Sequence, residues 1–196
     1  MSDAIMLPGW VVPPDVLDAA TESTSFNLKV PEHARGSKAG KFWTELLDCY
    51  GAEIEYVEPG FNSKGDATPK RWKVVVRFKV AAESQDETNI GRVVTMNGLL
   101  PYEVAVLSGP ACKEKTMGLM TLGKLKQFLI AAGLLPEDTS GINLDINEYF
   151  AGDAPAVQGA KVYALFKSYI DKQDKTTQRQ DITHFDSLEA GEANAA

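Results

Sequence analysis

The chain has 196 residues, of which 44% are hydrophobic and 24% charged, with a formal net charge of -7. This length suffices for one well-buried core, so we expect one domain with additional segments. The sequence has neither an apolar run long enough for a membrane span nor a signal-peptide pattern, which predicts a cytoplasmic protein without membrane contact. The negative charge excludes a binder that relies on a basic surface over the whole molecule.

Residues 1 to 48 are predicted to form an N-terminal extension, broken early by prolines. Within it, residues 26–30 favour a short strand and residues 40–49 a short helix. The two cysteines, Cys49 and Cys112, are too few for a disulfide framework. They are expected to be reduced thiols, as in a reducing cytoplasm.

Three strands are predicted next, over residues 52–58, 70–80 and 90–97, with a polar loop at 59–69. The second strand has the clearest pattern, because its residues alternate between an apolar and a cationic side. Its apolar side consists of Trp72, Val74, Val76, Phe78 and Val80. Its cations are Arg71, Lys73, Arg77 and Lys79.

The C-terminal part predicts a helix over residues 121–132, with Thr121 as cap and Gly133 as stop. A short helix at 145–151 and strands at 161–170 and 179–185 follow, joined by a polar hairpin loop. Residues 186–196 are expected to be a disordered tail. The order of three strands, helix and two strands predicts a mainly β, α+β domain over residues 49–185, resembling the five-stranded OB-fold barrel.

In an OB-fold, the second and third strands and the loops joining strands one to two and four to five bind oligonucleotides. Single-strand binders need cations for the phosphates and flat side chains for the bases. The predicted phosphate-binding side chains are Lys64, Arg71, Lys73, Arg77, Lys79, Arg92, Lys167, Lys172 and Lys175. The predicted stacking side chains are Phe61, Tyr163 and Tyr169.

An alternative for the cationic side is simple pairing within the sheet. Glu53 and Glu55 lie on the neighbouring predicted strand and could pair with Lys73 or Arg77. Exposed pairs of this kind contribute about 0–1 kcal/mol and imply no ligand. The two strand tyrosines could likewise pack on the N-terminal extension instead of stacking on bases.

No catalytic residue, metal ligand or cofactor is predicted, and the protein is not expected to be an enzyme. His33 and His184 are far apart and lack neighbouring ligands at zinc spacing. Gly60 and Gly65 have the spacing of a phosphate loop, but Asp66 occupies the place of its lysine. Residues 145–156 lack the glycine and the final glutamate of a calcium loop, so they favour a capped helix.

Three segments resemble a known family: RWKVVVRFKV at 71–80, NIGRVVTMNGLL at 89–100 and LMTLGKLKQFLIAAGLL at 119–135. The pattern over about residues 50 to 185 is similar to a small phage protein family of unknown function. Its genes often lie beside single-strand-annealing recombination genes. The resemblance implies an OB-fold protein of a bacteriophage that binds single-stranded DNA in the host cytoplasm.

The sequence thus predicts a non-catalytic single-stranded-DNA-binding protein that supports DNA replication or DNA recombination. Its expected partners are single-stranded DNA and recombination or replication proteins, and a homo-oligomer is compatible with the sequence. A protein-interaction or structural module of a virion or replisome is the alternative. The tail has only a dilute acidic character, with Asp186, Glu189 and Glu192, so recruitment of partners through it is left open.

Overall fold

A computed structural model describes residues 9–23, 42–84 and 87–195. Five long strands form one antiparallel sheet in the order β6-β5-β2-β8-β9. The strands are β2 (Phe42–Val57), β5 (Arg71–Val80), β6 (Val93–Pro101), β8 (Lys161–Ile170) and β9 (Gln178–Asp186). Numbered along the chain, these are the first to the fifth long strands, so the sheet order is three, two, one, four, five.

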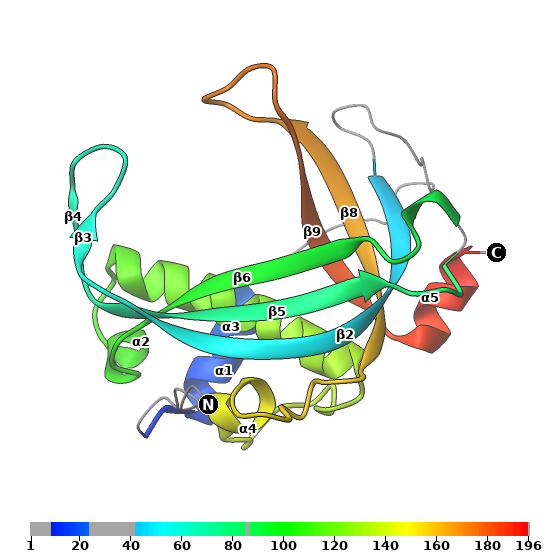
Figure 1. The fold of residues 1–196 in the computed structure, drawn as a ribbon. Coiled ribbons are helices and arrows are strands. Elements are labelled where there is room, and N and C mark those ends of the chain that lie inside the picture. Colours follow the sequence, from blue (N-terminus) through cyan, green and yellow to red (C-terminus); the bar gives the residue numbers. More distant parts are fainter. Residues whose placement is uncertain (1–8, 24–41, 85–86, 196) are drawn as a thin grey trace.

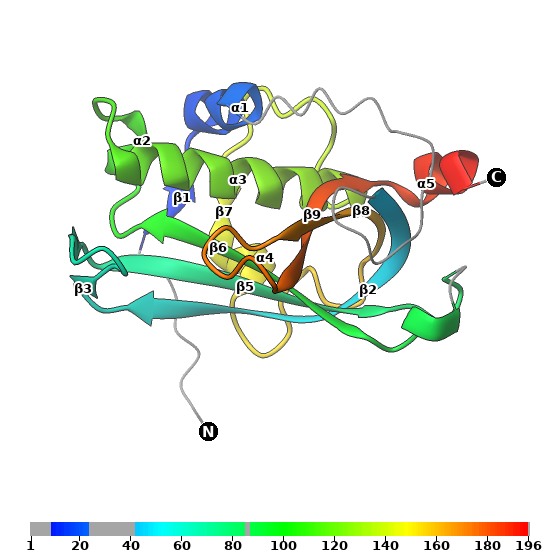
Figure 2. The ribbon, with the colours of Figure 1, turned by 90° about the horizontal axis from the view of Figure 1, so that it is seen from above.

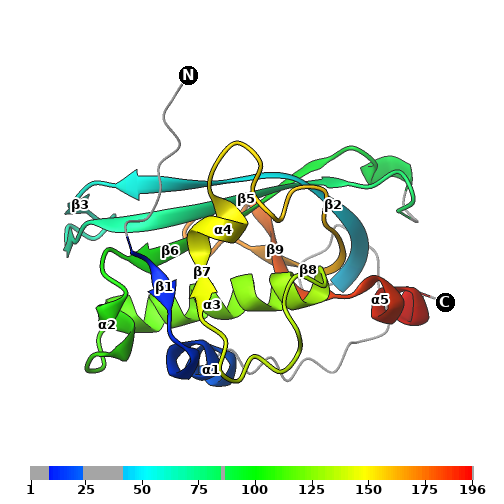
Figure 3. The same cartoon turned by 90° about the horizontal axis from the view of Figure 1, so that it is seen from below.

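Two short strand pairs and five α-helices complete the described part of the fold. The pairs are β1 (Val11–Val12) with β7 (Leu144–Asp145), and β3 (Gly60–Phe61) with β4 (Ala67–Thr68). The helices are α1 (Pro14–Ser23), α2 (Ala105–Ser108), α3 (Lys113–Ala131), α4 (Ile146–Phe150) and α5 (Leu188–Ala195), with a 3-10 turn at Glu87–Asn89. The hairpins β3–β4 and β8–β9 project from one side of the sheet, and α1 and α4 lie on the other (Figures 1 and 3).

The predicted mainly β, α+β class is confirmed, whereas the predicted closed barrel is corrected to an open sheet. The long strands have the expected order, but β6 and β9 are the two edges and do not pair with each other among the described residues. Helix α3 contacts both edges and runs alongside β6 (Figure 2). An OB-fold barrel would close between these two strands, and here the helix packs across that opening.

The core lies between α3 and the apolar side of the sheet. Phe128 of α3 packs edge-on against Phe78 of β5, with ring centroids 5.2 Å apart, and lies 5.4 Å from Phe185 of β9. Leu122 and Leu129 of the same helix are fully buried. Full burial of each such side chain contributes about 1.5–3 kcal/mol, so this cluster fixes the helix against both halves of the sheet.

Strand β6 and helix α3 approach each other most closely at Gly98. A Cβ atom at this position would lie 2.3 Å from Cγ2 of Thr121. The Thr121 hydroxyl also accepts a hydrogen bond from the Leu99 amide at 3.1 Å. The absence of a side chain at Gly98 therefore permits the contact that holds this edge strand on the helix.

The N-terminal segment contributes to the same core, which differs from the predicted extension over residues 1–48. Trp10, Val12 and Leu17 are buried, and α1 packs on α3. Strand β2 starts at Phe42, so residues 42–49 are extended instead of helical. The strand predicted at 26–30 and His33 lie outside the described residues.

The predicted disordered tail also differs, because β9 extends to Asp186 and α5 follows it. Gly191 of α5 packs directly on the Tyr163 ring, so that a Cβ atom there would lie 1.9 Å from Tyr163 Cδ2. None of the helices in the described ranges is long and apolar enough to cross a membrane.

Candidate functional site

The cationic side of β5 is engaged by neighbouring side chains. Lys73 forms an ion pair with Glu55 at 2.8 Å, because the register places these two residues opposite each other on β5 and β2. Arg77 pairs with Glu53 through a hydrogen bond that lowers the pKa of this carboxyl and raises the pKa of Arg77. Lys73 and Arg77 thus form the ion pairs with Glu55 and Glu53 that were predicted as the alternative to phosphate binding.

The two remaining cations of this strand have different surroundings. Lys79 Nζ lies 5.1 Å from the centroid of the Tyr50 ring. Arg71 lies at the far end of the strand, and its Nε is buried without a hydrogen-bond partner among the described residues. The four β5 cations therefore do not form one open phosphate-binding row.

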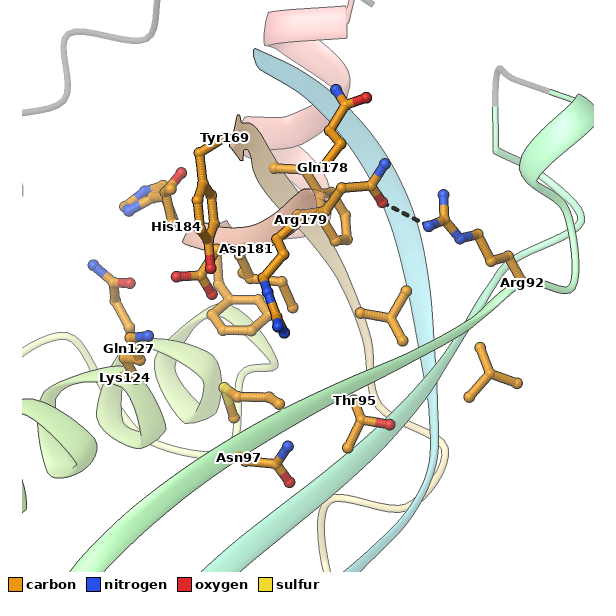
Figure 4. A pocket seen from close by; sticks show the side chains of 18 residues that line it. Arg92, Thr95, Asn97, Lys124, Gln127, Tyr169, Gln178, Arg179, Asp181 and His184 are labelled. Atoms are coloured by element: carbon orange, nitrogen blue, oxygen red, sulfur yellow. Dashed lines mark hydrogen bonds between the residues drawn. The ribbon is translucent and has the colours of Figure 1, made fainter. Parts of the chain in front are cut away.

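A groove with a volume of about 530 Å³ lies between the two open edges of the sheet. Its walls come from β6 and β9, Tyr169 of β8 lies at its rim, and Lys124 and Gln127 of α3 contribute to its floor (Figure 4). Three cations from different segments line it: Arg92 just before β6, Lys124 of α3 and Arg179 of β9. Among the described lining residues, Asp181 is the one carboxylate, so the groove has a positive net charge.

Hydrogen bonds orient two of the three groove cations. Nη2 of Arg92 donates to Oε1 of Gln180 at 2.7 Å, which links the edges β6 and β9 (Figure 4). Nε of Arg179 donates to Asp171 at the base of the β8–β9 hairpin. A backbone hydrogen bond from Gln173 and the bond from Arg179 both lower the pKa of Asp171. Asp171 thus remains ionised and holds Arg179 over the groove.

The remaining groove lining is rich in neutral polar groups. It includes Thr95, Asn97, Gln127, Gln178, Gln180 and Thr183. His184 also lines it; its Nε2 lies 2.9 Å from Asp186 Oδ1, and its Nδ1 is buried with no partner in the described part of the chain. Amides and hydroxyls of this kind can donate to phosphate and sugar oxygens or to base edges.

Two ordered hairpins carry further predicted residues. In β3–β4, the Asn62 side chain accepts hydrogen bonds from the amides of Lys64 at 2.8 Å and Asp66 at 3.0 Å. This arrangement is an Asx-type turn that fixes the loop. Phe61 beside it is 79% exposed, so a large aromatic ring is presented to solvent on a constrained hairpin.

In the β8–β9 hairpin, Asp174 accepts hydrogen bonds from the amide and hydroxyl of Thr176 and from the hydroxyl of Thr177. These bonds lower the pKa of Asp174 to about 2. Lys172 and Lys175 are exposed on the same loop. The hairpin therefore presents two lysines on a turn that its own aspartate stabilises.

The structure brings together only some of the residues predicted from the sequence. Arg92 and Tyr169 both line the groove. Tyr163 is half-buried beneath α5 and is not available for a base in this arrangement. Lys167 Nζ lies 5.3 Å from the Phe42 ring centroid. Phe61 and Lys64 are on the other hairpin, which does not line the groove.

Sequence reasoning missed Lys124, Gln127 and Arg179 as groove residues. Lys124 and Gln127 are three positions apart on the polar side of the predicted helix, and Arg179 begins the last predicted strand. The spacing of Lys124 and Gln127 does indicate that they share a helix face, because residues three apart lie on the same side of a helix. That this face lines a groove follows only from the packing of the helix across the open edge of the sheet.

No group of three or more His, Cys, Asp or Glu side chains within residues 9–23, 42–84 and 87–195 is arranged to hold a metal ion. Cys49 is buried, and burial raises the pKa of its thiol to about 11, which makes it a poor nucleophile. No model of a known protein family matches the chain, and no curated protein sequence is significantly similar to it.

Proposed function

We propose that this protein binds single-stranded DNA, without catalysis, in the groove between β6 and β9. The observation that carries the proposal is the convergence on one cavity of Arg92, which precedes β6, Lys124 of α3 and Arg179 of β9. Such a cluster concentrates positive charge locally on a chain whose net charge is -7. A negatively charged polymer is the ligand class that this charge distribution favours.

The chemistry of the lining supports a single strand over a duplex. Tyr169 is 40% exposed at the rim and offers a ring on which one base could stack. Stacking of a base on an aromatic ring contributes about 1–3 kcal/mol and requires unpaired bases. The β8–β9 hairpin would place Lys172 and Lys175 near the groove rim, on a loop where Asp171 and Asp174 balance their charge.

The β5 cations are expected to contribute less to DNA binding than the groove. To contact phosphates, Lys73 and Arg77 would have to leave Glu55 and Glu53. Such half-exposed pairs are weak, so exchange of partners is feasible but offsets part of the gain. Arg179 has a similar ion pair with Asp171, whereas Arg92 bonds to the neutral Gln180 and Lys124 forms no ion pair within the described residues. The main contribution to binding is therefore expected from Arg92 and Lys124 in the groove.

A role in DNA replication or recombination follows from the resemblance of the sequence to the phage family beside single-strand-annealing genes. A protein in such a role protects or presents a single strand to other proteins. This would place it in the cytoplasm of the infected host. Replication or recombination proteins would then be its partners.

The test is fluorescence anisotropy with labelled oligo-dT at two salt concentrations. Wild-type protein should bind at micromolar concentration in low salt, and binding should fall with a slope of about 0.7 per contacted phosphate. The triple variant Arg92→Ala/Lys124→Ala/Arg179→Ala should lose most of this affinity. Lys161→Ala is the control, because Lys161 pairs with Glu83 outside the groove. Absence of wild-type binding in low salt would refute the proposal.

A second candidate function is a protein-interaction module, favoured by the exposed Phe61. An aromatic side chain that is 79% exposed on a constrained hairpin is typical of a contact anchor. Size-exclusion chromatography with light scattering, comparing wild type and Phe61→Ala, tests self-association through it. Deleting residues 1–48 is unsuitable, since it removes the buried side chains of Trp10, Val12 and Leu17.

A further inference from the structure

A second cavity continues the groove along helix α3. It has a volume of about 440 Å³ and shares Asn97 and Lys124 with the groove between β6 and β9. Its other walls come from Gly98 and Leu99 of β6 and from Met117, Met120 and Thr121 of α3. Lys73 of β5 also lines it. Because two residues belong to both cavities, the two are adjacent parts of one track.

The second cavity differs from the first in chemistry. Its lining is mainly apolar, with the flexible side chains of Met117 and Met120 beside Leu99. Met120 is 50% exposed, so its side chain is accessible to a ligand in this cavity. The charged residues of the described lining are both cations, Lys73 and Lys124. Lys73 is paired with Glu55 and would have to exchange this partner for a phosphate, whereas Lys124 forms no ion pair among the described residues. An apolar floor between these two cations fits base faces flanked by phosphates.

The excess of cations along α3 ends at a third cavity. The next cavity along α3 shares Met117 and has a volume of about 250 Å³. Lys70 and Arg71 line it together with two carboxylates, Glu103 and Glu114. Equal numbers of both signs remove the net attraction for a phosphate, so we expect a bound strand to stop near Met117.

We infer that a single strand bound in the β6–β9 groove continues along α3, with its bases against Met117 and Met120 and its phosphates between Lys124 and Lys73. This inference rests on the function proposed above. From Lys124, the helix residue that both cavities share, to Met117 the helix advances about 10 Å. A stacked strand advances about 3.4 Å per nucleotide, so this part of the track accommodates about three nucleotides beyond those in the groove.

The test compares labelled dT4 with dT8 in wild type and in Met120→Glu. The short oligonucleotide fits within the groove, whereas dT8 reaches the second cavity. A carboxylate at position 120 should weaken dT8 binding about fivefold or more through repulsion of phosphate, and should leave dT4 binding within about twofold. The exposed position should tolerate the change, which circular dichroism and the thermal midpoint verify.

The matched control is Leu188→Glu. Leu188 on α5 is 42% exposed and lines neither cavity, so this variant makes the same change in net charge at a distant site. It should leave binding of both oligonucleotides unchanged. Equal losses for Met120→Glu and Leu188→Glu, or equal losses for dT4 and dT8, would overturn the inferred path.

The outcomes separate the path from the proposed function. If wild type binds both oligonucleotides, Arg179→Ala weakens both, and Met120→Glu weakens neither, the groove is the site and the path along α3 is refuted. If wild type binds neither in low salt, the proposed function fails and the path fails with it.

Discussion

Arg92 and Gln180 join the two open edges of the sheet: the guanidinium of Arg92 donates to the side-chain carbonyl of Gln180 at 2.7 Å (Figure 4). The two residues are 88 positions apart. In a closed barrel, β6 and β9 would pair here through backbone hydrogen bonds. In this open sheet, the side-chain hydrogen bond between Arg92 and Gln180 connects the two edges instead. The same contact spans the groove that we propose for DNA, so its two partners can be varied independently.

Removing the charge of Arg92 should weaken binding of oligo-dT. Arg92→Gln should lower affinity and reduce the slope of log K against log salt by about 0.7, which corresponds to one phosphate contact. Gln180→Ala removes the bridge but keeps the cation, so affinity should stay the same or rise. Anisotropy titrations at three salt concentrations measure both effects. An unchanged slope in Arg92→Gln would argue against a phosphate contact at this position.

The two cysteines should differ strongly in reactivity. Cys49 is buried, with a thiol pKa raised to about 11 by burial, whereas Cys112 is exposed at the start of α3. At pH 8, a thiol-specific reagent should therefore modify Cys112 rapidly and Cys49 only after unfolding. The measurement is the thiol titre with Ellman's reagent in native buffer and in denaturant. Rapid reaction in native Cys112→Ser would contradict the burial of Cys49.

Gly98→Ala should destabilise the protein by about 1–3 kcal/mol, since the added methyl group would overlap Thr121. The nearest atom is Cγ2 of Thr121. Thr121→Ser removes this atom while keeping the hydroxyl that accepts from the Leu99 amide. The double variant should therefore recover part of the loss. Denaturant unfolding of the two single variants and the double variant measures the recovery, and strictly additive losses would contradict the contact.

The Asp174 carboxyl in the β8–β9 turn should become protonated only in strong acid. Hydrogen bonds from Thr176 and Thr177 hold its pKa at about 2, below the ordinary value of 3.8. A carboxyl whose pKa is lowered on folding stabilises the folded state above its unfolded pKa, and this contribution is lost as pH falls through the folded pKa. The hairpin amides should thus keep their chemical shifts down to about pH 3 and change near pH 2.

NMR titration of the Asp174 carboxyl carbon and of the Thr176 amide measures this behaviour. The control is Asp174→Asn, which cannot titrate at this position and should remove the acid-dependent shift of the Thr176 amide. A midpoint near 3.8 in the wild type would show that the side-chain hydrogen bonds are not formed in solution.

Periodicity in the sequence located the strands that have one buried side. Residues 71–80 and 161–170 alternate between apolar and polar positions, and β5 and β8 have those bounds. The start of β2 was predicted as a helix because Phe42, Leu46 and Leu47 are apolar. Leu46 and Leu47 are both buried, since each side of β2 is covered at this point. Coverage of both sides abolishes the alternation on which the prediction depends.

Helix α3 was predicted from Thr121 but begins at Lys113. Its first two turns contain Gly118 and half-buried Met117, which interrupt the apolar stripe. Gly118 packs against Leu107 and Pro101, where a Cβ atom would lie 2.6 Å from Leu107 Cδ2. This part of the helix is thus adapted to a tertiary contact and carries little periodic signal.

The amino-acid sequence by itself determined the mainly β class, the order of the long strands and the cationic side of β5, because these follow from alternation between near neighbours. The tertiary structure decided that the sheet stays open and that Glu53 and Glu55 form ion pairs with two of the β5 cations. It also decided that Lys124, Arg92 and Arg179 meet in one groove. The reason is physical: pairing and convergence depend on distances between residues far apart in the chain. These distances are set by how α3 packs across the edges of the sheet.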